Sequence, residues 1–479
     1  MKFLMVGIDG LGAESLAALQ LRRLQEIIEQ GRSANPLPDN MVSRGWTEIY
    51  SGKNAYETGG FFQIPVMSKN RIVATQDTGV STIAGHIGAE NLLWGKLRRA
   101  GHRVGVFTLP TVNKRQDDCE LSIPATGGGV FSAGIDSAAA KPAQAASLAN
   151  YGRSNLGFRM GKGAFLPASR SELEAWLRDH IAQYFTTLRR TLDRYPVDSL
   201  VLGSRFVTLH YKFRHILCGN PGGPDDAALR DLILEIARDF DGEMAAFITD
   251  ANPEHLFITS DHGLGELKFH VNINALLREL GLIDYPGAAF RLARFGKRKV
   301  LERRQPRRQR GPLFPMYGLE RSRAFSIGYT DVVYVNDARF TGPSMSNEER
   351  YTVACVVAEE LSQHVRERGY EQQFREFIPM KHQGWSSPGD NGAPAVALPD
   401  IRCVLEEGTV NLGRTGGEVV RVNETLGARD MFRNGFFAEH SACKTSDCLA
   451  AYRGSAEMDF GPQRLTDVYG AMLKPMGID

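Results

Sequence analysis

The sequence predicts an α/β protein whose central, mostly parallel sheet carries helices on both faces. Short apolar runs bounded by Gly, Asp or Ser alternate with longer amphipathic segments along the chain, as strands alternate with helices in folds of this class. Helix stop signals stand where that alternation needs them, at Gly101 and Pro196. With 479 residues, the chain is long enough for one large core and additional insertions.

The individual elements follow from this alternation. Apolar runs predict strands over 3–8, 104–108, 199–203, 256–259 and 401–405. Amphipathic spacing predicts helices over 13–30, 91–100, 171–194, 225–248, 347–366 and 465–473. We therefore expect residues 1–479 to form a single catalytic domain of this α/β type. Residues 111–170 and 291–310 do not fit the rhythm, and the segments 111–170 and 270–320 are expected to be cap insertions within the domain.

The second of these insertions contains a strongly basic stretch. Residues 291–310 include ten Lys or Arg. Such a run is typical of a solvated surface, and the functional alternative is an attractor for an anionic substrate, lipid headgroups or RNA.

The overall composition is that of an ordinary globular enzyme. Lys and Arg total 57 and Asp and Glu total 55, so the net charge gives no reason to expect specific nucleic-acid binding. The six cysteines are scattered, without the dense spacing of a secreted disulfide framework, which favours a cytoplasmic location. No apolar run approaches the roughly 20 residues of a spanning helix, so we expect no transmembrane segment.

Polar residues directly after two of the expected strands are the first candidates for a functional site. Asp9 follows the first strand, and Asp261 and His262 follow the strand at 256–259. Ligands in open α/β sheets bind beyond the carboxyl ends of the strands, and a carboxylate beside an imidazole suits a divalent ion such as Zn²⁺. The alternatives are a helix N-cap for Asp261 and His262 and a turn acid for Asp9. A dinucleotide-binding turn fits poorly, because its third glycine would fall on Ser15.

Several segments together resemble one known family. The chain resembles the type I phosphodiesterase and nucleotide pyrophosphatase branch of the alkaline phosphatase superfamily along nearly its whole length. The resemblance lies in the following segments: Val6-Gly7-Ile8-Asp9-Gly10, Gly45-Trp46-Thr47-Glu48, Ser260-Asp261-His262-Gly263, Arg323-Ala324-Phe325, Pro399-Asp400-Ile401, Glu439-His440 and Leu465-Thr466-Asp467-Val468.

This resemblance implies two divalent ions, usually zinc, that clamp an in-line displacement at phosphorus. It implies that Asp9, Asp261 and His262 hold one ion, together with a hydroxyl nucleophile, and that His210 and His440 hold the other. Charge developing in the reaction would be stabilised by Lys53, Asn54 or backbone N–H groups, with Arg44 as a further substrate-binding candidate. Zn²⁺ is the expected cofactor, with one or two ions bound and with Mn²⁺ or Mg²⁺ as alternatives.

Two positions depart from the family pattern. The nucleophile position falls on Val42, which has no hydroxyl, so Ser43 is the first candidate in its place and Thr47 the second. The carboxylate expected four residues before His210 falls on Phe206, which cannot bind a metal. The second ion therefore needs a replacement ligand, from Asp447, His215 or another group.

The leading hypothesis is a metal-dependent phosphohydrolase that cleaves a phosphate ester or anhydride of a small molecule or nucleotide. One alternative keeps the fold and acts on a sulfate or phosphonate, or transfers the group to another acceptor with a single metal. A second alternative, suggested by Val42 and Phe206, is a catalytically degenerate protein that binds a phosphorylated ligand or a partner.

Overall fold

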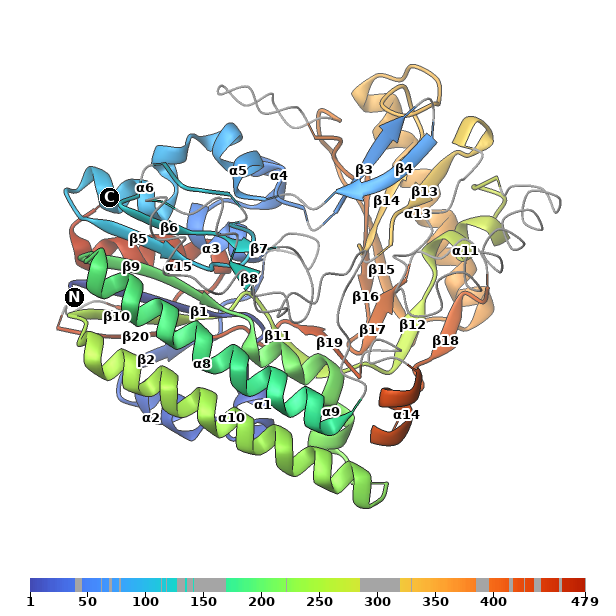
Figure 1. The fold of residues 1–479 in the computed structure, drawn as a ribbon. Helices are drawn as coiled ribbons and strands as arrows, with labels where there is room; N and C mark the ends of the chain where they lie inside the picture. Colours follow the sequence, from blue (N-terminus) through green and yellow to red (C-terminus); the bar gives the residue numbers. More distant parts are fainter. Residues whose placement is uncertain are drawn as a thin grey trace.

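In the computed structural model, a seven-stranded sheet forms the centre of the larger lobe (Figure 1). The structure describes residues 1–38, 45–61, 63–68, 71–76, 79–112, 114–117, 119–126, 134–135, 141, 169–220, 222–284, 319–328, 330–384, 396–412, 417–425, 427–434, 441–455 and 459–478. The sheet order is β2-β20-β10-β1-β9-β5-β6. These strands are β2 (Arg32–Ala34), β20 (Ala450–Gly454), β10 (His255–Thr259), β1 (Phe3–Ile8), β9 (Ser199–Ser204), β5 (Val104–Phe107) and β6 (Leu121–Ile123).

Most of this sheet is parallel. The five strands from β10 to β6 run in one direction, and β20 is antiparallel to both of its neighbours, β10 and β2. Successive residues of β1 face opposite sides of the sheet, as the pleat requires: Leu4 and Val6 join one hydrophobic cluster, and Phe3 and Met5 join another. The predicted mostly parallel sheet with helices on both faces is confirmed.

The two faces of the sheet are covered by different helices. On the Leu4 face lie α1 (Ala13–Ala18), α2 (Arg22–Glu29), α8 (Arg170–Arg194), α9 (His210–Cys218) and α10 (Pro224–Ala251). On the Phe3 face lie α3 (Gly45–Ser51), α5 (Val80–Ile87), α6 (Leu93–Arg99) and α15 (Leu465–Leu473). Figure 1 shows α8 and α10 running side by side across the front of the sheet. None of the helices in the described ranges is both long and apolar enough to cross a membrane.

A smaller lobe, on the right of Figure 1, has its own hydrophobic cluster. A four-stranded sheet in the order β13-β14-β16-β15 is its centre, beside a three-stranded sheet in the order β17-β12-β18. Its main elements are β12 (Phe269–Val271), α11 (Ile273–Glu279), β13 (Ala324–Ser326), β14 (Val332–Val335), α13 (Asn347–Arg368), β15 (Phe374–Pro379), β16 (Ile401–Leu405), β17 (Thr409–Asn411) and β18 (Val420–Val422). Most of the expected cap segment 270–320 lies outside the described residues, as does most of 111–170 with the exception of the strands near its start.

The remaining short elements connect the lobes or lie at their edges. They are α4 (Ala55–Thr58), β3 (Ile64–Ser68), β4 (Arg71–Gln76), β7 (Ala125–Thr126), β8 (Gly134–Ile135), β11 (Gly263–Glu266), α14 (Ala428–Asn434) and β19 (Ala442–Thr445). The strands β11 and β19 pair with each other next to the large sheet.

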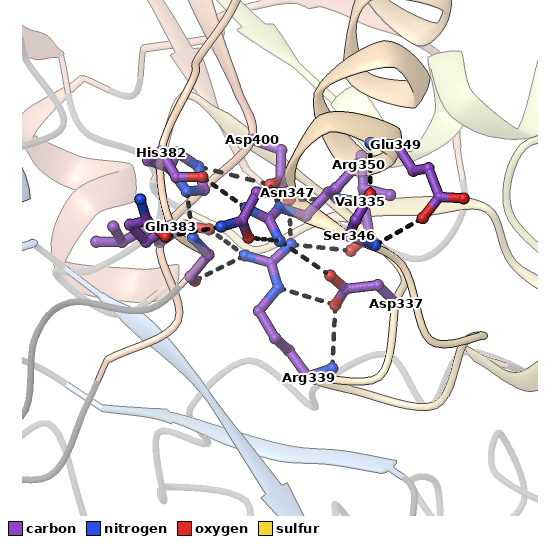
Figure 2. A network of polar contacts seen from close by, with 12 residues as sticks. Val335, Asp337, Arg339, Ser346, Asn347, Glu349, Arg350, His382, Gln383 and Asp400 are labelled. Atoms are coloured by element: carbon purple, nitrogen blue, oxygen red, sulfur yellow. Dashed lines mark hydrogen bonds and ion pairs between the residues drawn. The ribbon is translucent and has the colours of Figure 1, made fainter.

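A buried ion-pair network holds the smaller lobe together (Figure 2). The guanidinium of Arg339 lies 2.8 Å from Asp337 Oδ1 and 2.6 Å from Asp400 Oδ2, and that of Arg350 lies 3.1 Å from Asp400 Oδ1. His382 Nδ1 accepts a hydrogen bond from the Gly384 N–H, so its Nε2 carries the proton that is donated to the Pro399 carbonyl. Two cations and two anions surround a neutral imidazole, and the buried charges are therefore balanced.

Candidate metal centre

Three neighbouring strands bring polar residues to one edge of the large sheet. β1 pairs in parallel register with β10 on one side and β9 on the other, with Gly7 opposite Thr259 and Ile8 opposite Ser204. Their carboxyl ends therefore meet at the same place. Asp9 follows β1, Asp261 and His262 follow β10, and Arg205 follows β9.

The first three of these side chains form a compact, buried group. His262 Nε2 lies 3.5 Å from Asp9 Oδ1 and 3.5 Å from Asp261 Oδ2. One ligand atom of each residue lies within 4.8 Å of the others. Asp9, Asp261 and His262 are 4%, 5% and 2% exposed, so water reaches them only in a restricted way. Oxygen and nitrogen donors at such separations can share one small cation.

The imidazole of His262 is oriented for this purpose. Its Nδ1 lies 2.8 Å from the Gly263 carbonyl oxygen, which can only accept, so Nδ1 carries the proton. Nε2 is then the ring nitrogen that faces the two carboxylates. Metal-bound histidines commonly donate their other ring N–H to a carbonyl or carboxylate in this way. The helix N-cap alternative is wrong, because the strand β11, and no helix, begins at Gly263.

The two carboxylates have different surroundings. Burial raises the pKa of Asp9, but the positive charge of Arg205 and the contact with His262 outweigh it and hold that pKa well below its ordinary value. Arg205 Nε lies 3.4 Å from Asp9 Oδ2. Burial and the nearby charge of Asp9 raise the pKa of Asp261, and its Oδ1 has no hydrogen-bond partner among the described residues. A buried oxygen without a partner costs free energy unless a cation compensates it.

Helix α3 closes the other side of this group. The Trp46 Nε1–H donates to Asp9 Oδ2 at 3.2 Å, and the Trp46 ring lies so close to β1 that a Cβ at Gly7 would come within 2.7 Å of it. At the helix start, a Cβ on Gly45 would come within 2.5 Å of the Asp261 carbonyl oxygen. Glycine at these two positions therefore allows the helix to approach both acids closely.

Among the residues that the structure describes, Asp9, Asp261 and His262 fit a divalent ion. They supply two carboxylates and one correctly oriented imidazole, the orphaned Asp261 oxygen needs a positive partner, and Trp46 supports the Asp9 carboxylate from outside. These donor types suit zinc and, with water completing the ligand shell, Mn²⁺ or Mg²⁺.

Three other expected site residues have local roles. Thr47 is completely buried within α3, and its carbonyl accepts from Ser51. Lys53 Nζ pairs with Glu57 at 3.0 Å on the exposed surface. The Asn54 side chain caps α4, accepting from the N–H groups of Tyr56 and Glu57. Neither Lys53 nor Asn54 bonds to Asp9, Asp261 or His262 in the described part of the chain.

His210 lies in a different environment from the three clustered residues. Its Nε2 is 3.3 Å from Glu14 Oε1, at the start of α1. Burial opposes ionisation of Glu14, but contacts with His210 and Arg214 lower its pKa to about 2. Phe206 points into the core and stacks on Phe240, with ring centroids 4.3 Å apart.

The structure places both replacement ligands named for residue 206 near α1 and α9. Asp447 Oδ2 accepts from the Ala13 N–H at 2.7 Å and so caps α1. His215 lies on α9, and its backbone N–H donates to Ser441 Oγ at 3.5 Å. Val42, Ser43, Arg44 and His440 lie outside the described residues.

Three residues of the site were not predicted from the sequence. Arg205 stands directly after a predicted strand, so the same position rule that selected Asp9 could have found it. Trp46 stands in a segment of the family resemblance, but that segment gives no sign of its hydrogen bond to Asp9. Lys444 lies on β19 opposite Leu264, and its charge, after the effects of burial, Arg205 and His262, further lowers the pKa of Asp9. Leu264 and Lys444 are 180 positions apart in the sequence, so local spacing does not predict this pairing.

Comparisons with known proteins give structural matches only. No family model and no curated protein sequence matches the chain. Murine ectonucleotide pyrophosphatase/phosphodiesterase 5 aligns at 13% identity with a TM-score of 0.46, over 100% of this chain and 96% of that one. Phosphonoacetate hydrolase from Sinorhizobium meliloti 1021, in complex with phosphonoformate, aligns at 12% identity with a TM-score of 0.46, over 99% and 95%. A variant of alkaline phosphatase PafA aligns at 11% identity with a TM-score of 0.49, over 99% and 96%.

At identities of 11–13%, the roles of side chains do not carry over from one protein to another. The chemistry of this chain therefore has to follow from its own residues.

Proposed function

We propose that this protein is a metal-dependent hydrolase of phosphate esters or anhydrides, in which Asp9, Asp261 and His262 hold a divalent ion. The observation that carries the proposal is the position of His262 Nε2, which lies 3.5 Å from each of two carboxylates while Nδ1 is engaged by a carbonyl. When bound, such an ion lowers the pKa of a hydroxyl nucleophile and neutralises charge on a phosphoryl oxygen.

Cationic side chains at the same edge of the sheet favour an anionic substrate. Arg205 Nε makes no hydrogen bond among the described residues apart from its ion-pair contact with Asp9, and the side chain is 18% exposed. Its remaining N–H groups can donate to a non-bridging phosphoryl oxygen, a partner that suits guanidinium geometry. The exposed Lys444 adds positive charge nearby. A phosphorylated small molecule or nucleotide is therefore the proposed substrate class.

Ser43 remains the proposed nucleophile, with Thr47 as the second candidate. Thr47 is 0% exposed inside α3, which disfavours access to a substrate. Gly45, two residues after Ser43, is packed against Asp261, and two peptide units span at most about 7 Å. These observations support a hydroxyl from the segment before α3 over one within the helix. Roles for Arg44, Lys53 and Asn54 in substrate binding, and the cytoplasmic location, stay predictions.

Metal analysis combined with turnover tests this proposal. Protein prepared without chelators should contain a divalent ion and hydrolyse bis(p-nitrophenyl) phosphate or a nucleotide anhydride, and a chelator should abolish turnover reversibly. Ser43→Ala should lower kcat by about 10³-fold or more, while Thr47→Val should retain most of it.

The contrary outcomes separate the alternatives. Full turnover in Ser43→Ala, with loss in Thr47→Val, would transfer the nucleophile role to Thr47. Turnover of p-nitrophenyl sulfate or of a phosphonate monoester in preference to the phosphate compounds would favour the sulfate or phosphonate alternative. A protein that binds phosphate but turns over none of these compounds would be the degenerate binding protein.

A further inference from the structure

A second group of metal-ligating side chains lies between α1 and α9. His210 Nε2 is 3.3 Å from Glu14 Oε1 and 3.9 Å from Cys218 Sγ. One ligand atom of each of these three residues lies within 4.8 Å of the others. The group contains a nitrogen, an oxygen and a sulfur donor, the combination that zinc and similar transition metals bind.

The histidine of this group is held by its surroundings and directs one nitrogen at the other two ligands. His210 is 0% exposed, and its Nδ1 has no hydrogen-bond partner among the described residues. All of its recorded polar contacts are therefore at Nε2, where the carboxylate and the thiol meet. Cys218 is exposed at the end of α9, so an ion can reach the group from solvent.

Glu14 is supported from outside in the manner of a metal-binding carboxylate. Arg214, one helical turn after His210 on α9, bonds to both Glu14 oxygens: its Nε to Oε1, and its Nη2 to Oε2 at 3.2 Å. Bonds of this kind orient ligating carboxylates and keep them charged. Glu14 thus provides a fixed acid beside His210, whereas Phe206, at the position where the sequence pattern expects a carboxylate, stacks on Phe240 in the core.

We propose that Glu14, His210 and Cys218 form a second, thiolate-containing site for a transition-metal ion, separate in its ligands from the Asp9, Asp261 and His262 group. Three protein ligands leave a fourth position for water or another group. The bound ion would join α1, which begins four residues after Asp9, to α9, whose Tyr211 ring packs edge-on against His262 with centroids 6.1 Å apart. The site requires no turnover and goes beyond the proposed hydrolase activity.

Cobalt spectroscopy on the whole protein tests this site, because only a thiolate ligand gives Co²⁺ an intense near-ultraviolet charge-transfer band. Metal-free wild-type protein titrated with Co²⁺ should develop that band. Cys218→Ser should lose the band and bind one ion per chain fewer, and Glu14→Gln should keep the band but need about 10- to 100-fold more Co²⁺. Cys355→Ser, at a half-buried cysteine on α13, is the matched control and should behave like the wild type.

Two further variants keep the two metal sites distinguishable. Asp261→Asn should weaken the nitrogen and oxygen site and turnover but leave the band intact, so failure of the proposed activity would not affect this result. Cys448, whose Sγ donates to the Asp261 carbonyl at 3.5 Å, is the competing thiol. The proposal would be overturned if the wild-type protein developed no band. It would also be overturned if the band survived Cys218→Ser and disappeared in Cys448→Ala. In either case His210 and Glu14 would be a structural hydrogen-bonded pair.

Discussion

The buried Asp261 carboxylate lowers the stability of the folded protein unless a cation binds at the site. Its Oδ1 is buried and has no hydrogen-bond partner among the described residues, and the Asp9 charge lies nearby. Asp261→Asn removes the charge while keeping the shape. We expect metal-free Asp261→Asn to unfold with a free energy about 1 to 3 kcal/mol higher than the metal-free wild type, and to lose the stabilisation that a divalent ion gives. Denaturant unfolding with and without the ion measures both effects.

Asp241 provides the matched control for this prediction. It is equally buried, but its two oxygens accept the N–H groups of Arg23 and Leu24 at 2.8 and 2.9 Å. Asp241→Asn should lower the free energy of unfolding, because the amide offers only one acceptor to two donors. If both variants were destabilised to the same extent without metal, the account of Asp261 as an uncompensated charge would be wrong.

At the scale of single residues, the sequence predicted the candidate ligands of the metal site but not the residues that hold those ligands in place. Asp9, Asp261 and His262 were recognisable because each directly follows a readable strand. The hydrogen bond from Trp46 to Asp9 depends on how α3 docks against β1. Glu14 beside His210 depends on the packing of α1 against α9. Tertiary contacts of this kind leave no trace in local spacing.

Among the secondary-structure elements, α3 is the one most tightly constrained by the metal site. A Cβ on Gly45 would come within 2.5 Å of the Asp261 carbonyl oxygen and 2.8 Å of its Cβ, and Asp261 is buried between β10 and β11. Gly45→Ala should therefore lower the free energy of unfolding by about 1 to 3 kcal/mol and weaken metal binding, because either the helix or Asp261 must move. Thermal unfolding and a metal titration measure the two effects.

Gly470 in α15 is the natural comparison, because nothing lies within 4 Å of its added Cβ. Gly470→Ala should raise the free energy of unfolding by about 0.5 to 1 kcal/mol through helix propensity alone and leave metal affinity unchanged. Equal responses of the two variants would mean that Gly45 is an ordinary helix residue rather than a contact point.

Most long elements were predictable, and one failure has a clear backbone cause. The strands β1, β5, β9, β10 and β16 and the long helices lie within a few residues of their predicted positions. The helix predicted over 13–30 is divided into α1 and α2 by a turn in which Gln20 adopts a φ of 54° between the buried Leu19 and Leu21. No Gly or Pro marks that break. Burial of the two leucines outweighs the helix propensity of the segment.

At the scale of the whole molecule, the buried network of the smaller lobe makes stability depend on pH. Burial lowers the pKa of His382 to about 4, whereas an imidazole in an unfolded chain titrates near ~6.5. Below pH 6.5 the His382 imidazole therefore binds a proton in the unfolded chain but stays unprotonated in the folded protein until the pH approaches 4. The contribution of this group is complete above pH 6.5 and is lost as the pH falls towards 4, at up to about 1.4 kcal/mol per pH unit.

Comparing wild type with His382→Asn isolates this effect. The variant should be less stable at pH 7, because it loses one of the two bonds of the ring, and its free energy of unfolding should fall less steeply between pH 6.5 and 4. His180, whose pKa burial also lowers to about 4, remains in both proteins and contributes the same slope to each. Parallel pH profiles for the two proteins would contradict the assignment.

The position of β20 also has a consequence for how the protein is made. This strand lies between β2 and β10 in the sheet, and α15 packs against α3, the helix that touches both acids of the metal site. During synthesis, β2 and β10 leave the ribosome long before the strand that joins them. The nascent chain thus exposes an unpaired strand edge, open to chaperones and to aggregation, until residues 450–473 have emerged. The metal site can therefore assemble fully only after residues 450–473 have been synthesised, whatever the supply of metal.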